Sequence, residues 1–409
     1  MYTEITKCRI SDSSNLIPVL SLGIQYLTGV FPKQITDEVS KGPLDLVWCP
    51  ESGLLQMKQA YNSEEMYGDN YGYRSGLNSS MVQHLRNKVL SLERLIKLTE
   101  SDLVIDIGSN DATLLKAYSG NHRKVGIDPT GIKFKEYYSA EITLIPDFFS
   151  KEVFRKEFPD TKAKIITSIA MFYDLENPAS FVADIESCLD DNGIWHFEQS
   201  YMPSMLRTNS YDTICHEHVE FYSFKVVKNL LDFNGMRVVD VQMNAVNGGS
   251  FAVTACKTSA SFISNTPIIN WMIKQEDDMG LETPKPYRDF EERVFKHRKN
   301  LIELIEALVA DGKKVFGYGA STKGNVLLQF CNFNSKQIQY IAEVNSDKFG
   351  SFTPGTHISI ISEEEAKAMN PDYFLVLPWH FKHNILEREK DYIANGGKFI
   401  FPLPEIEIV

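Results

Sequence analysis

The stretch from Cys215 to Ser223 holds the densest group of side chains that could do chemistry, with Glu217 between His216 and His218. In a strand the two histidines would share one face and could share a metal ion, whereas in a loop Glu217 and His218 could act as a base and its partner. A helical zinc motif spaces its histidines four residues apart rather than two, and the sequence places no third ligand. Histidine suits the removal of a proton from carbon, because its pKa lies near neutral pH. A structural role for the histidines stays open.

A second group of candidates follows the apolar run from Leu103 to Gly108, which predicts a buried strand that ends at a glycine. Leu114 and Leu115 then predict the start of a helix. Backbone N–H groups at such a junction can face a bound ligand, and glycine lets the ligand approach closely because it has no Cβ atom. Asp128 ends the next predicted strand, where a carboxylate can accept hydrogen bonds from both hydroxyls of a ribose. In the competing interpretation, Asp128 only caps a turn.

The ligand at this junction is predicted to lack phosphates. A phosphate-binding fingerprint would need three glycines, but the chain has Gly108, Asn110 and Thr113 at those positions, and Asp111 would repel a pyrophosphate. S-adenosylmethionine is a nucleoside without phosphates, and its positive sulfonium favours a nearby carboxylate. We therefore predict that Gly108 and Asn110 help to bind this cofactor.

Four other residues complete the predicted cofactor site. Ser109 lies in the same loop, and Asp128 faces the ribose. Asp147 and Phe148 follow a third predicted strand, where they could contact the adenine amino group and supply a stacking face. The stretch Met171–Leu175 is expected to border the methyl donor without a chemical role of its own.

The elements that position these residues alternate between strands and helices, which predicts an α/β fold with a parallel sheet. Further strands are predicted over Val125–Asp128, Lys164–Ile169, Gly193–Glu198, Met236–Met243, Ser250–Cys256, Gln339–Val344 and Tyr373–Leu377. Apolar residues at intervals of three and four predict helices over Met81–Leu98 and 286–310. A second strand–glycine–helix unit at Lys314–Gly324 predicts a second, smaller α/β domain.

Composition limits the class of protein. A chain of 409 residues is long enough for two or three domains, and its formal net charge of -12 argues against a sequence-independent grip on nucleic acid. No apolar run approaches the roughly 20 residues that span a bilayer. The 6 cysteines are scattered, which indicates a reducing compartment, so we expect a cytoplasmic protein without a membrane anchor.

The ordered set of motifs resembles the three-domain S-adenosylmethionine-dependent C-methyltransferases of deoxysugar biosynthesis. The matching segments are Tyr67–Gly76, Val104–Asp111, the Glu217–His218 pair and Gly319–Gly324. The resemblance covers nearly the whole chain and implies three domains. These are a small zinc-ribbon-like domain (1–75), a central class I, Rossmann-like methyltransferase domain (76–265) and a C-terminal Rossmann-like α/β domain that binds substrate (266–409).

The resemblance also implies a substrate and roles for residues. The substrate would be a 4-keto-6-deoxy sugar on a nucleoside diphosphate, deprotonated at C3 before methyl transfer. Carried over, His218 is the base, Glu217 is its partner, and Tyr73 can donate to the developing enolate or return a proton. The implied substrate-binding residues are Tyr73, Arg74, Ser75, Glu198 and Lys323. A solvated lysine at a helix start is the competing interpretation of Lys323. The carrier nucleotide and the oligomeric state are not predicted.

The chain departs from the family pattern in two places. The family usually holds zinc with two Cys-x-x-Cys pairs, but here Ser11 and Ser52 replace the second cysteine of each, after Cys8 and Cys49. A neutral hydroxyl is a poor zinc ligand, so we predict no metal and a first domain that relies on apolar burial. Cys215 stands where relatives often carry a tyrosine, so a phenol donor is lost there.

Two other functions stay open. Gly317 and Gly319 follow a predicted strand, and Glu343 ends a later one, as in NAD(P)-dependent oxidoreductases. Thr322 replaces the third glycine of that fingerprint, so this interpretation ranks lower. A non-catalytic protein that binds a nucleotide sugar would follow if Cys215 and the lost zinc ligands marked decay.

Overall fold

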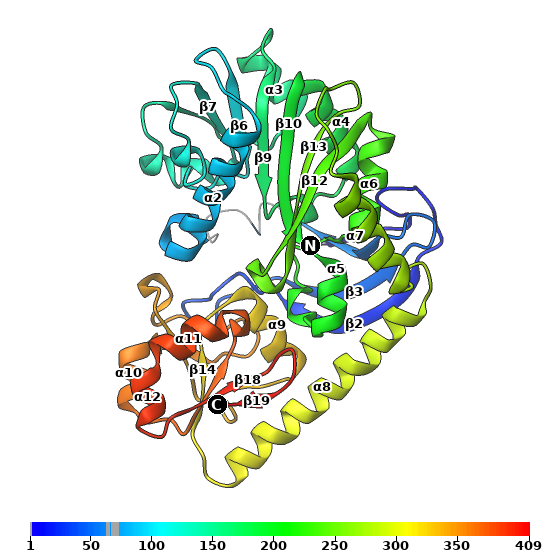
Figure 1. Ribbon diagram of the computed structural model, residues 1–409. Coiled ribbons are helices and arrows are strands. Elements are labelled where there is room, and N and C mark those ends of the chain that lie inside the picture. Colours follow the sequence, from blue (N-terminus) through cyan, green and yellow to red (C-terminus); the bar gives the residue numbers. More distant parts are fainter. Residues whose placement is uncertain (1, 63–65, 67–72) are drawn as a thin grey trace.

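The structure is a computed structural model that describes residues 2–62, 66 and 73–409 (Figure 1). A seven-stranded sheet occupies the upper half of Figure 1 and a six-stranded sheet the lower half, with strands β2 and β3 between them. In the described part of the chain, no helix is both long and apolar enough to cross a membrane. All six cysteines are buried and free of disulfides.

The seven-stranded sheet has the order β12-β13-β10-β9-β6-β7-β8. Its strands are β6 Leu103–Ile107, β7 Arg123–Ile127, β8 Ile142–Ile145, β9 Ala163–Ile169, β10 Leu189–Ser200, β12 Met236–Asn244 and β13 Ser250–Lys257. Strands β6 to β10 pair in parallel, and β13 runs antiparallel to both of its neighbours. The carboxyl ends of the parallel strands therefore meet at one edge, where such sheets bind ligands.

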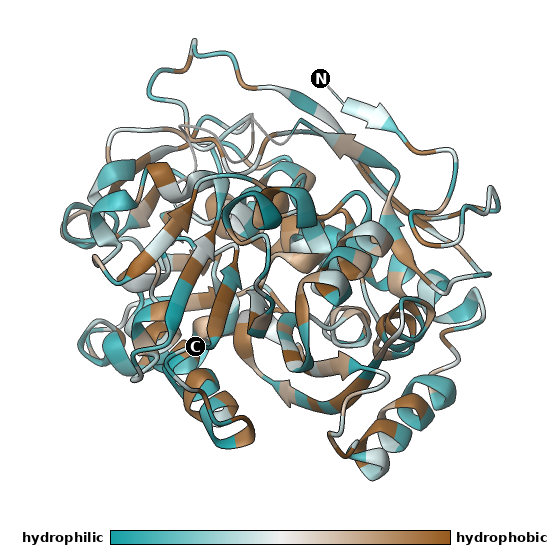
Figure 2. Ribbon diagram, turned by 90° about the horizontal axis from the view of Figure 1, so that it is seen from above, coloured by the Kyte–Doolittle hydropathy of each residue, from teal (hydrophilic) through white to brown (hydrophobic). Residues whose placement is uncertain are grey.

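Alternate side chains of β6 face two different apolar cores, as expected for a strand covered on both faces. Leu103, Ile105 and Ile107 belong to the same core as the helices α3, α4 and α6, whereas Val104 packs with α2. The helices of this unit are α2 Ser79–Leu95, α3 Lys151–Glu157, α4 Pro178–Cys188, α5 Met202–Thr208, α6 Phe224–Phe233 and α7 Thr266–Asp278. The helices carry alternating brown and teal bands in Figure 2, since each has one apolar face.

The small N-terminal sheet has the order β11-β4-β3-β2, with strands β2 Ile17–Tyr26, β3 Lys41–Trp48, β4 Leu55–Met57 and β11 Glu220–Phe221. A separate pair joins β1 Tyr2–Glu4 to β5 Gln59–Tyr61. Strand β11 comes from the segment directly after His218, so the histidine-rich stretch is built into the N-terminal sheet. Trp48 stacks on Tyr287 with ring centroids 4.9 Å apart, and one apolar core continues from this sheet into the C-terminal unit.

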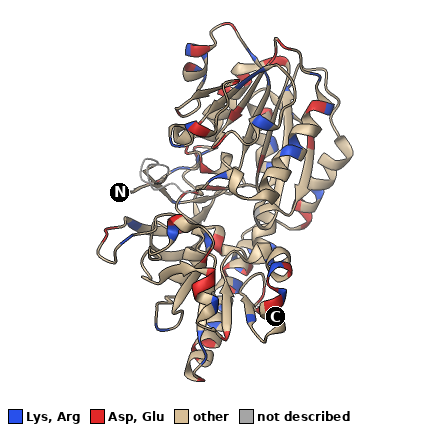
Figure 3. Cartoon of the chain, turned by 90° about the vertical axis from the view of Figure 1, so that its left-hand side faces the viewer, with Lys and Arg blue, Asp and Glu red and all other residues tan. Residues whose placement is uncertain are grey.

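The C-terminal unit follows the long helix α8, Lys285–Ala310. Its sheet has the order β16-β15-β14-β17-β18-β19, with strands β14 Val315–Tyr318, β15 Tyr340–Glu343, β16 Ser359–Ser362, β17 Tyr373–Val376, β18 Lys398–Phe401 and β19 Glu407–Ile408. The helices are α9 Thr322–Phe330, α10 Glu363–Ala368, α11 Lys382–Arg388 and α12 Lys390–Ala394. Acidic and basic residues are interspersed along the helices of both α/β units (Figure 3).

The predicted helix at Leu114 and Leu115 is wrong. The segment after β6 forms turns and a short 3-10 helix, Leu115–Ala117. Asn110 and Ala112 have φ of 49° and 60°, which a right-handed helix does not allow. The side chain of Asp111 accepts hydrogen bonds from the backbone N and Oγ1 of Thr113, and such local bonds compete with a helix. Turns, rather than a helix N-terminus, therefore follow the glycine at the end of β6.

Candidate active site

Gly108 lies at the carboxyl end of β6, with its backbone exposed and a φ of +71°. A Cβ atom at this position would lie 3.2 Å from Cγ of Met171, which follows β9. A residue other than glycine would be strained here and would fill the space beside the strand edge. The position therefore allows a ligand to approach the backbone closely.

Asp128 ends β7 and is 5% exposed. Its Oδ1 accepts hydrogen bonds from the backbone N and Oγ1 of Thr130, both at 2.7 Å, so it does cap a turn. Its Oδ2 accepts a hydrogen bond from the backbone N of Asn110 at 2.7 Å, which ties the loop after β6 to the end of β7. A carboxylate has about four acceptor sites, so one is left for a ribose hydroxyl. The ribose contact stays a prediction.

Asn110 also holds the segment that contains Tyr73. Its Nδ2 donates to the backbone O of Tyr73 at 3.1 Å, and its Oδ1 accepts from the backbone N of Ser75 at 3.0 Å. Tyr73 as a whole residue is 49% exposed, and burial raises the pKa of its phenol, so the hydroxyl keeps the proton that it could donate to a ligand. Residues 67–72 of the same motif lie outside the described residues. The loop after β6 thus joins the predicted cofactor residues to the predicted substrate residues.

Arg74 lies in the same segment with its guanidinium 4.4 Å from the ring centroid of Tyr137, whose hydroxyl accepts a hydrogen bond from it. Its Nε lies 3.9 Å from Oδ2 of Asp111. The structure therefore gives Arg74 two protein partners, and its role toward the substrate stays a prediction.

Asp147 and Phe148 follow β8 at the same sheet edge. Both are exposed, and the ring of Phe148 has 52% of its surface accessible. Oδ1 of Asp147 accepts a hydrogen bond from the backbone N of Phe148 at 2.7 Å. An exposed aromatic face beside a carboxylate can stack on a base and bind its amino group.

His218 lies in the turn that precedes β11. Its Nδ1 is 2.8 Å from the backbone O of Thr213, and its ring packs edge-on against Tyr173 with centroids 4.5 Å apart. Because a carbonyl oxygen only accepts, Nδ1 must carry the proton, which leaves the lone pair on Nε2. Burial, and then the charge of Lys323, lowers the pKa of His218 to about 4, so the ring is neutral near pH 7.

The carboxylate of Glu217 points to a different place. A Cβ atom on Gly29 would lie 2.7 Å from Oε1 of Glu217 and 3.7 Å from Oγ1 of Thr322, so this carboxylate lies between the turn that follows β2 and the start of α9. Its Oε2 is buried and has no hydrogen-bond partner among the described residues. Burial raises the pKa of Glu217. Within the described part of the chain no hydrogen bond joins it to His218, so its role as the partner of the base stays a prediction.

His216 faces the N-terminal sheet. Its Nε2 donates to the backbone O of Gln25 at 3.2 Å, and its ring packs edge-on against Tyr61. The ring is fully buried, and burial lowers its pKa to about 4. His216 and His218 thus point to different neighbours, and the described residues contain no cluster of three or more metal-ligating side chains.

Lys323 lies in the first turn of α9, which packs against the short 3-10 helix Tyr211–Thr213. Its charge lowers the pKa of His218 and also counters the rise that burial causes in the pKa of Asp212. Oδ2 of Asp212 accepts a hydrogen bond from Nε1 of Trp379 at 2.8 Å. The C-terminal unit thus brings a lysine to the histidine of the central unit.

A short segment connects the two groups of residues. Met171 packs over Gly108, and the ring of Tyr173, two positions later, packs against His218. The backbone O of Tyr173 accepts a hydrogen bond from the backbone N of Val219 at 3.0 Å. Gly108 and His218 therefore lie at opposite ends of one short segment after β9.

Three family models match the chain: "Putative zinc binding domain" over 8–67, "Methyltransferase domain" over 82–241 and "C-methyltransferase C-terminal domain" over 245–404. The C-methyltransferase NovU of Streptomyces niveus is 32% identical over 414 residues, which cover 99% of this chain and 97% of that protein. The chain belongs to this C-methyltransferase family.

Two other proteins resemble only part of the chain or resemble its fold only weakly. A UDP-N-acetylmuramate–L-alanine ligase of Salinispora tropica is 35% identical over 78 residues, 18% of this chain and 15% of that protein. The solved magnesium protoporphyrin IX methyltransferase of Synechocystis PCC 6803 with bound SAH has a TM-score of 0.34 at 14% identity, covering 48% of this chain and 92% of that one.

Membership of the C-methyltransferase family confirms the predicted fold class and makes the chain an S-adenosylmethionine-dependent enzyme. The oxidoreductase alternative is set aside on this ground. In the structure, the carboxylate of Glu343 accepts hydrogen bonds from the backbone N of Ala320, Val344 and Asn345. The predicted domain boundaries at 75/76 and 265/266 stay predictions.

The residues at the edge of the central sheet fit the cofactor of a C-methyltransferase. Gly108 leaves open backbone, Asp128 has an acceptor site to spare, and Phe148 offers an aromatic face. The negative charges of Asp128 and Asp147 favour a positive sulfonium over a phosphate. These residues would hold S-adenosylmethionine, which supplies an electrophilic methyl group.

The four positions of the zinc motif come together although two of them are serines. Sγ of Cys8 lies 3.2 Å from Oγ of Ser52, and Sγ of Cys49 lies 3.5 Å from Oγ of Ser11. Hydrogen bonds between thiols and hydroxyls thus join the two turns that the family joins through its cysteines. Two cysteines with two neutral hydroxyls are a poor donor set for zinc. The absence of zinc from this family member stays a prediction.

Glu198, at the end of β10, belongs to a separate charged group. Its Oε1 lies 2.7 Å from Nε2 of His84, and its Oε2 lies 2.6 Å from Nζ of Lys88 and accepts from Nδ2 of Asn244 at 2.6 Å. Burial raises the pKa of Glu198, but these two bases outweigh it and lower that pKa to about 2. Substrate binding by Glu198 stays a prediction.

The sequence did not single out Asp212, Trp379 or His380. Asp212 is buried and His380 is half-buried, and the charge of Lys323 lowers the pKa of both. No local pattern could reveal them, because Trp379 lies far along the chain from the acid that it contacts. The packing of the C-terminal unit against the segment Tyr211–Thr213 places Trp379 beside Asp212.

Proposed function

We propose that this C-methyltransferase transfers a methyl group to C3 of a 4-keto-6-deoxy sugar linked to a nucleoside diphosphate. The observation that carries the proposal is the placement of His218. It is neutral, it faces a cation from another domain, and the segment after β9 links it to the cofactor edge. The sugar class comes from the resemblance of the ordered motifs.

In this mechanism, Nε2 of His218 takes the proton from C3. The electron pair of that C–H bond moves into the ring carbon–carbon bond, and the carbonyl electrons move onto the oxygen at C4, which gives an enolate. The hydrogen bond from Nδ1 to the carbonyl of Thr213 fixes the tautomer and favours the imidazolium that forms. C3 of the enolate is then the nucleophile that accepts the methyl group.

A base with a low pKa needs help to remove a proton from carbon. Lys323 brings a positive charge to the cleft, and that charge stabilises the enolate oxygen as it develops. The phenol of Tyr73, whose pKa is raised by burial, can donate a second hydrogen bond or return a proton. In the free enzyme the same lysine keeps His218 unprotonated, so both effects favour the reactive form.

Incubation in deuterated water tests the proposal. With a dTDP-linked 4-keto-6-deoxy sugar and no methyl donor, the enzyme is expected to exchange the C3 proton for deuterium, which proton NMR follows. With S-adenosylmethionine added, the same sample is expected to yield a C3-methylated sugar nucleotide by mass spectrometry. Methylation on oxygen or at C5, or methylation without exchange at C3, would contradict the proposed position or step.

Removing the charge of Lys323 is expected to shift the pH dependence. The base works when unprotonated, so kcat/KM should fall only as the pH drops toward the pKa of about 4 of His218. In Lys323→Gln one of the two causes that lower this pKa is gone, so the acid limb should move to higher pH. A pH profile of kcat/KM measures it. Lys336→Gln, at an exposed lysine, is the control and should keep the wild-type limb. An unchanged limb in Lys323→Gln would show that the lysine does not act on the base.

A further inference from the structure

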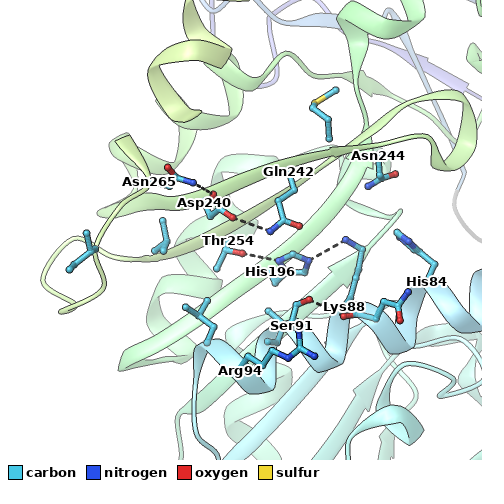
Figure 4. A pocket seen from close by; sticks show the side chains of 16 residues that line it. His84, Lys88, Ser91, Arg94, His196, Asp240, Gln242, Asn244, Thr254 and Asn265 are labelled. Carbon is cyan, nitrogen blue, oxygen red and sulfur yellow. Dashed lines mark hydrogen bonds between the residues drawn. The ribbon is translucent and has the colours of Figure 1, made fainter. Parts of the chain in front are cut away.

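A groove of about 570 Å³ lies between α2 and the strands β10, β12 and β13 (Figure 4). Neither His218 nor Lys323 is among the residues that line it. The volume is in the range of small-molecule sites. The groove is therefore a second place where a ligand could bind, apart from the proposed catalytic cleft.

The charges that line the groove are mostly paired. Lys88 is bound to Glu198 at 2.6 Å, and both carboxylate oxygens of Asp240 accept hydrogen bonds from the side-chain amides of Asn265 and Gln242, at 2.9 and 3.0 Å. The exception is Arg94 on α2, which has no acidic partner among the described residues. In a chain with a net charge of -12, this unpaired guanidinium favours an anion.

The remaining lining mixes neutral hydrogen-bonding groups with apolar side chains, namely Leu92, Leu95, Val239, Met243 and Ile263. Ser91, Gln242 and Thr254 present hydroxyl or amide groups along the groove (Figure 4). His196 donates from Nδ1 to Thr254 and accepts from Lys88, and burial lowers its pKa to about 3, so it is neutral. A sugar carries hydroxyls around apolar C–H faces, so it matches this mixture of polar and apolar groups.

We propose that this groove binds an anionic, hydroxyl-rich organic molecule of the sugar-phosphate class, with Arg94 as the partner of its anion. A planar guanidinium can bind two oxygens of one phosphate at once. The amides and hydroxyls of β12, β13 and α2 bind the sugar hydroxyls. The site is independent of the proposed methyl transfer.

The test compares the binding of glucose 1-phosphate, the anionic probe, with the binding of glucose, which has the same sugar without the charge. Calorimetry on the full chain is expected to show binding of the phosphate at least about tenfold tighter than binding of glucose. Arg94→Gln should lose that affinity by about tenfold or more, the usual scale for a charged hydrogen bond. Arg86→Gln is the matched control, because Arg86 is an exposed arginine on the same helix that does not line the groove.

The probe could also enter the catalytic cleft, so Lys323→Gln separates the two places. Binding that survives in Lys323→Gln but falls in Arg94→Gln supports the groove. Binding that falls in Lys323→Gln and survives in Arg94→Gln overturns it, as does an absence of binding to the wild type. A second variant, Gln242→Leu, should weaken the binding of glucose 1-phosphate. The variant should keep its fold, since the side chain of Gln242 is exposed. Unchanged affinity in both Arg94→Gln and Gln242→Leu would likewise overturn the proposal.

Discussion

His218→Asn is expected to lower turnover at least ~100-fold, the usual scale for the loss of a general base. Asparagine can still donate a hydrogen bond toward the carbonyl of Thr213, so the loop should keep its shape. It cannot take a proton from carbon. Affinity for S-adenosylhomocysteine should be unchanged, because the cofactor residues lie at the other end of the segment after β9. Steady-state kinetics and calorimetry measure the two quantities.

The control for this variant is His383→Asn, at an exposed histidine of α11, which should keep both turnover and cofactor affinity. Exchange of the C3 proton in deuterated water should stop in His218→Asn and continue in the control. If His218→Asn still turned over and exchanged, the base would lie elsewhere. His216 would then be the first residue to test, although its ring is buried against Tyr61.

Much of the central fold could be predicted from the sequence because its strands are short apolar runs buried on both faces. Leu103–Gly108 and Lys164–Ile169 were predicted as strands, and the structure has them as Leu103–Ile107 and Ala163–Ile169. The helix predicted over 286–310 is Lys285–Ala310. The helix predicted at Leu114 does not form. Two residues with positive φ, Asn110 and Ala112, and the hydrogen bond between Asp111 and Thr113 favour turns in this segment.

The candidate site could be predicted only in part. Gly108 and Asp128 follow strands at a fixed edge, so the local pattern was enough to place them. The direction of the Glu217 side chain could not be predicted from the sequence, because it depends on Gly29 in the turn after β2 and on Thr322 of α9. The contacts of Glu198 could not be predicted for the same reason, since its partners come from α2 and from the end of β12. Contacts between distant segments decide these side chains, and sequence spacing does not encode them.

Gly108→Val is expected to weaken the binding of S-adenosylhomocysteine by about 100-fold or more. At a φ of +71° a β-branched residue is strained, and its Cβ would lie 3.2 Å from Cγ of Met171. The side chain would fill the exposed backbone edge that the proposed cofactor site needs. Since Met171 leads to Tyr173 and His218, turnover should fall as well. Calorimetry gives the affinity, and thermal unfolding gives the cost in stability.

Gly235→Val is the control that separates the effect of backbone strain on stability from the effect of a blocked cofactor site on affinity. Gly235 has a φ of +73°, its backbone is exposed, and a Cβ atom there would meet nothing within 4 Å. Both variants should lose stability on the scale of strained backbone, roughly 1–3 kcal/mol each. Only Gly108→Val should lose the cofactor, because only that glycine lies beside Asp128 at the carboxyl edge of the parallel strands. Equal cofactor affinity in the two variants would mean that the nucleoside binds somewhere other than the end of β6.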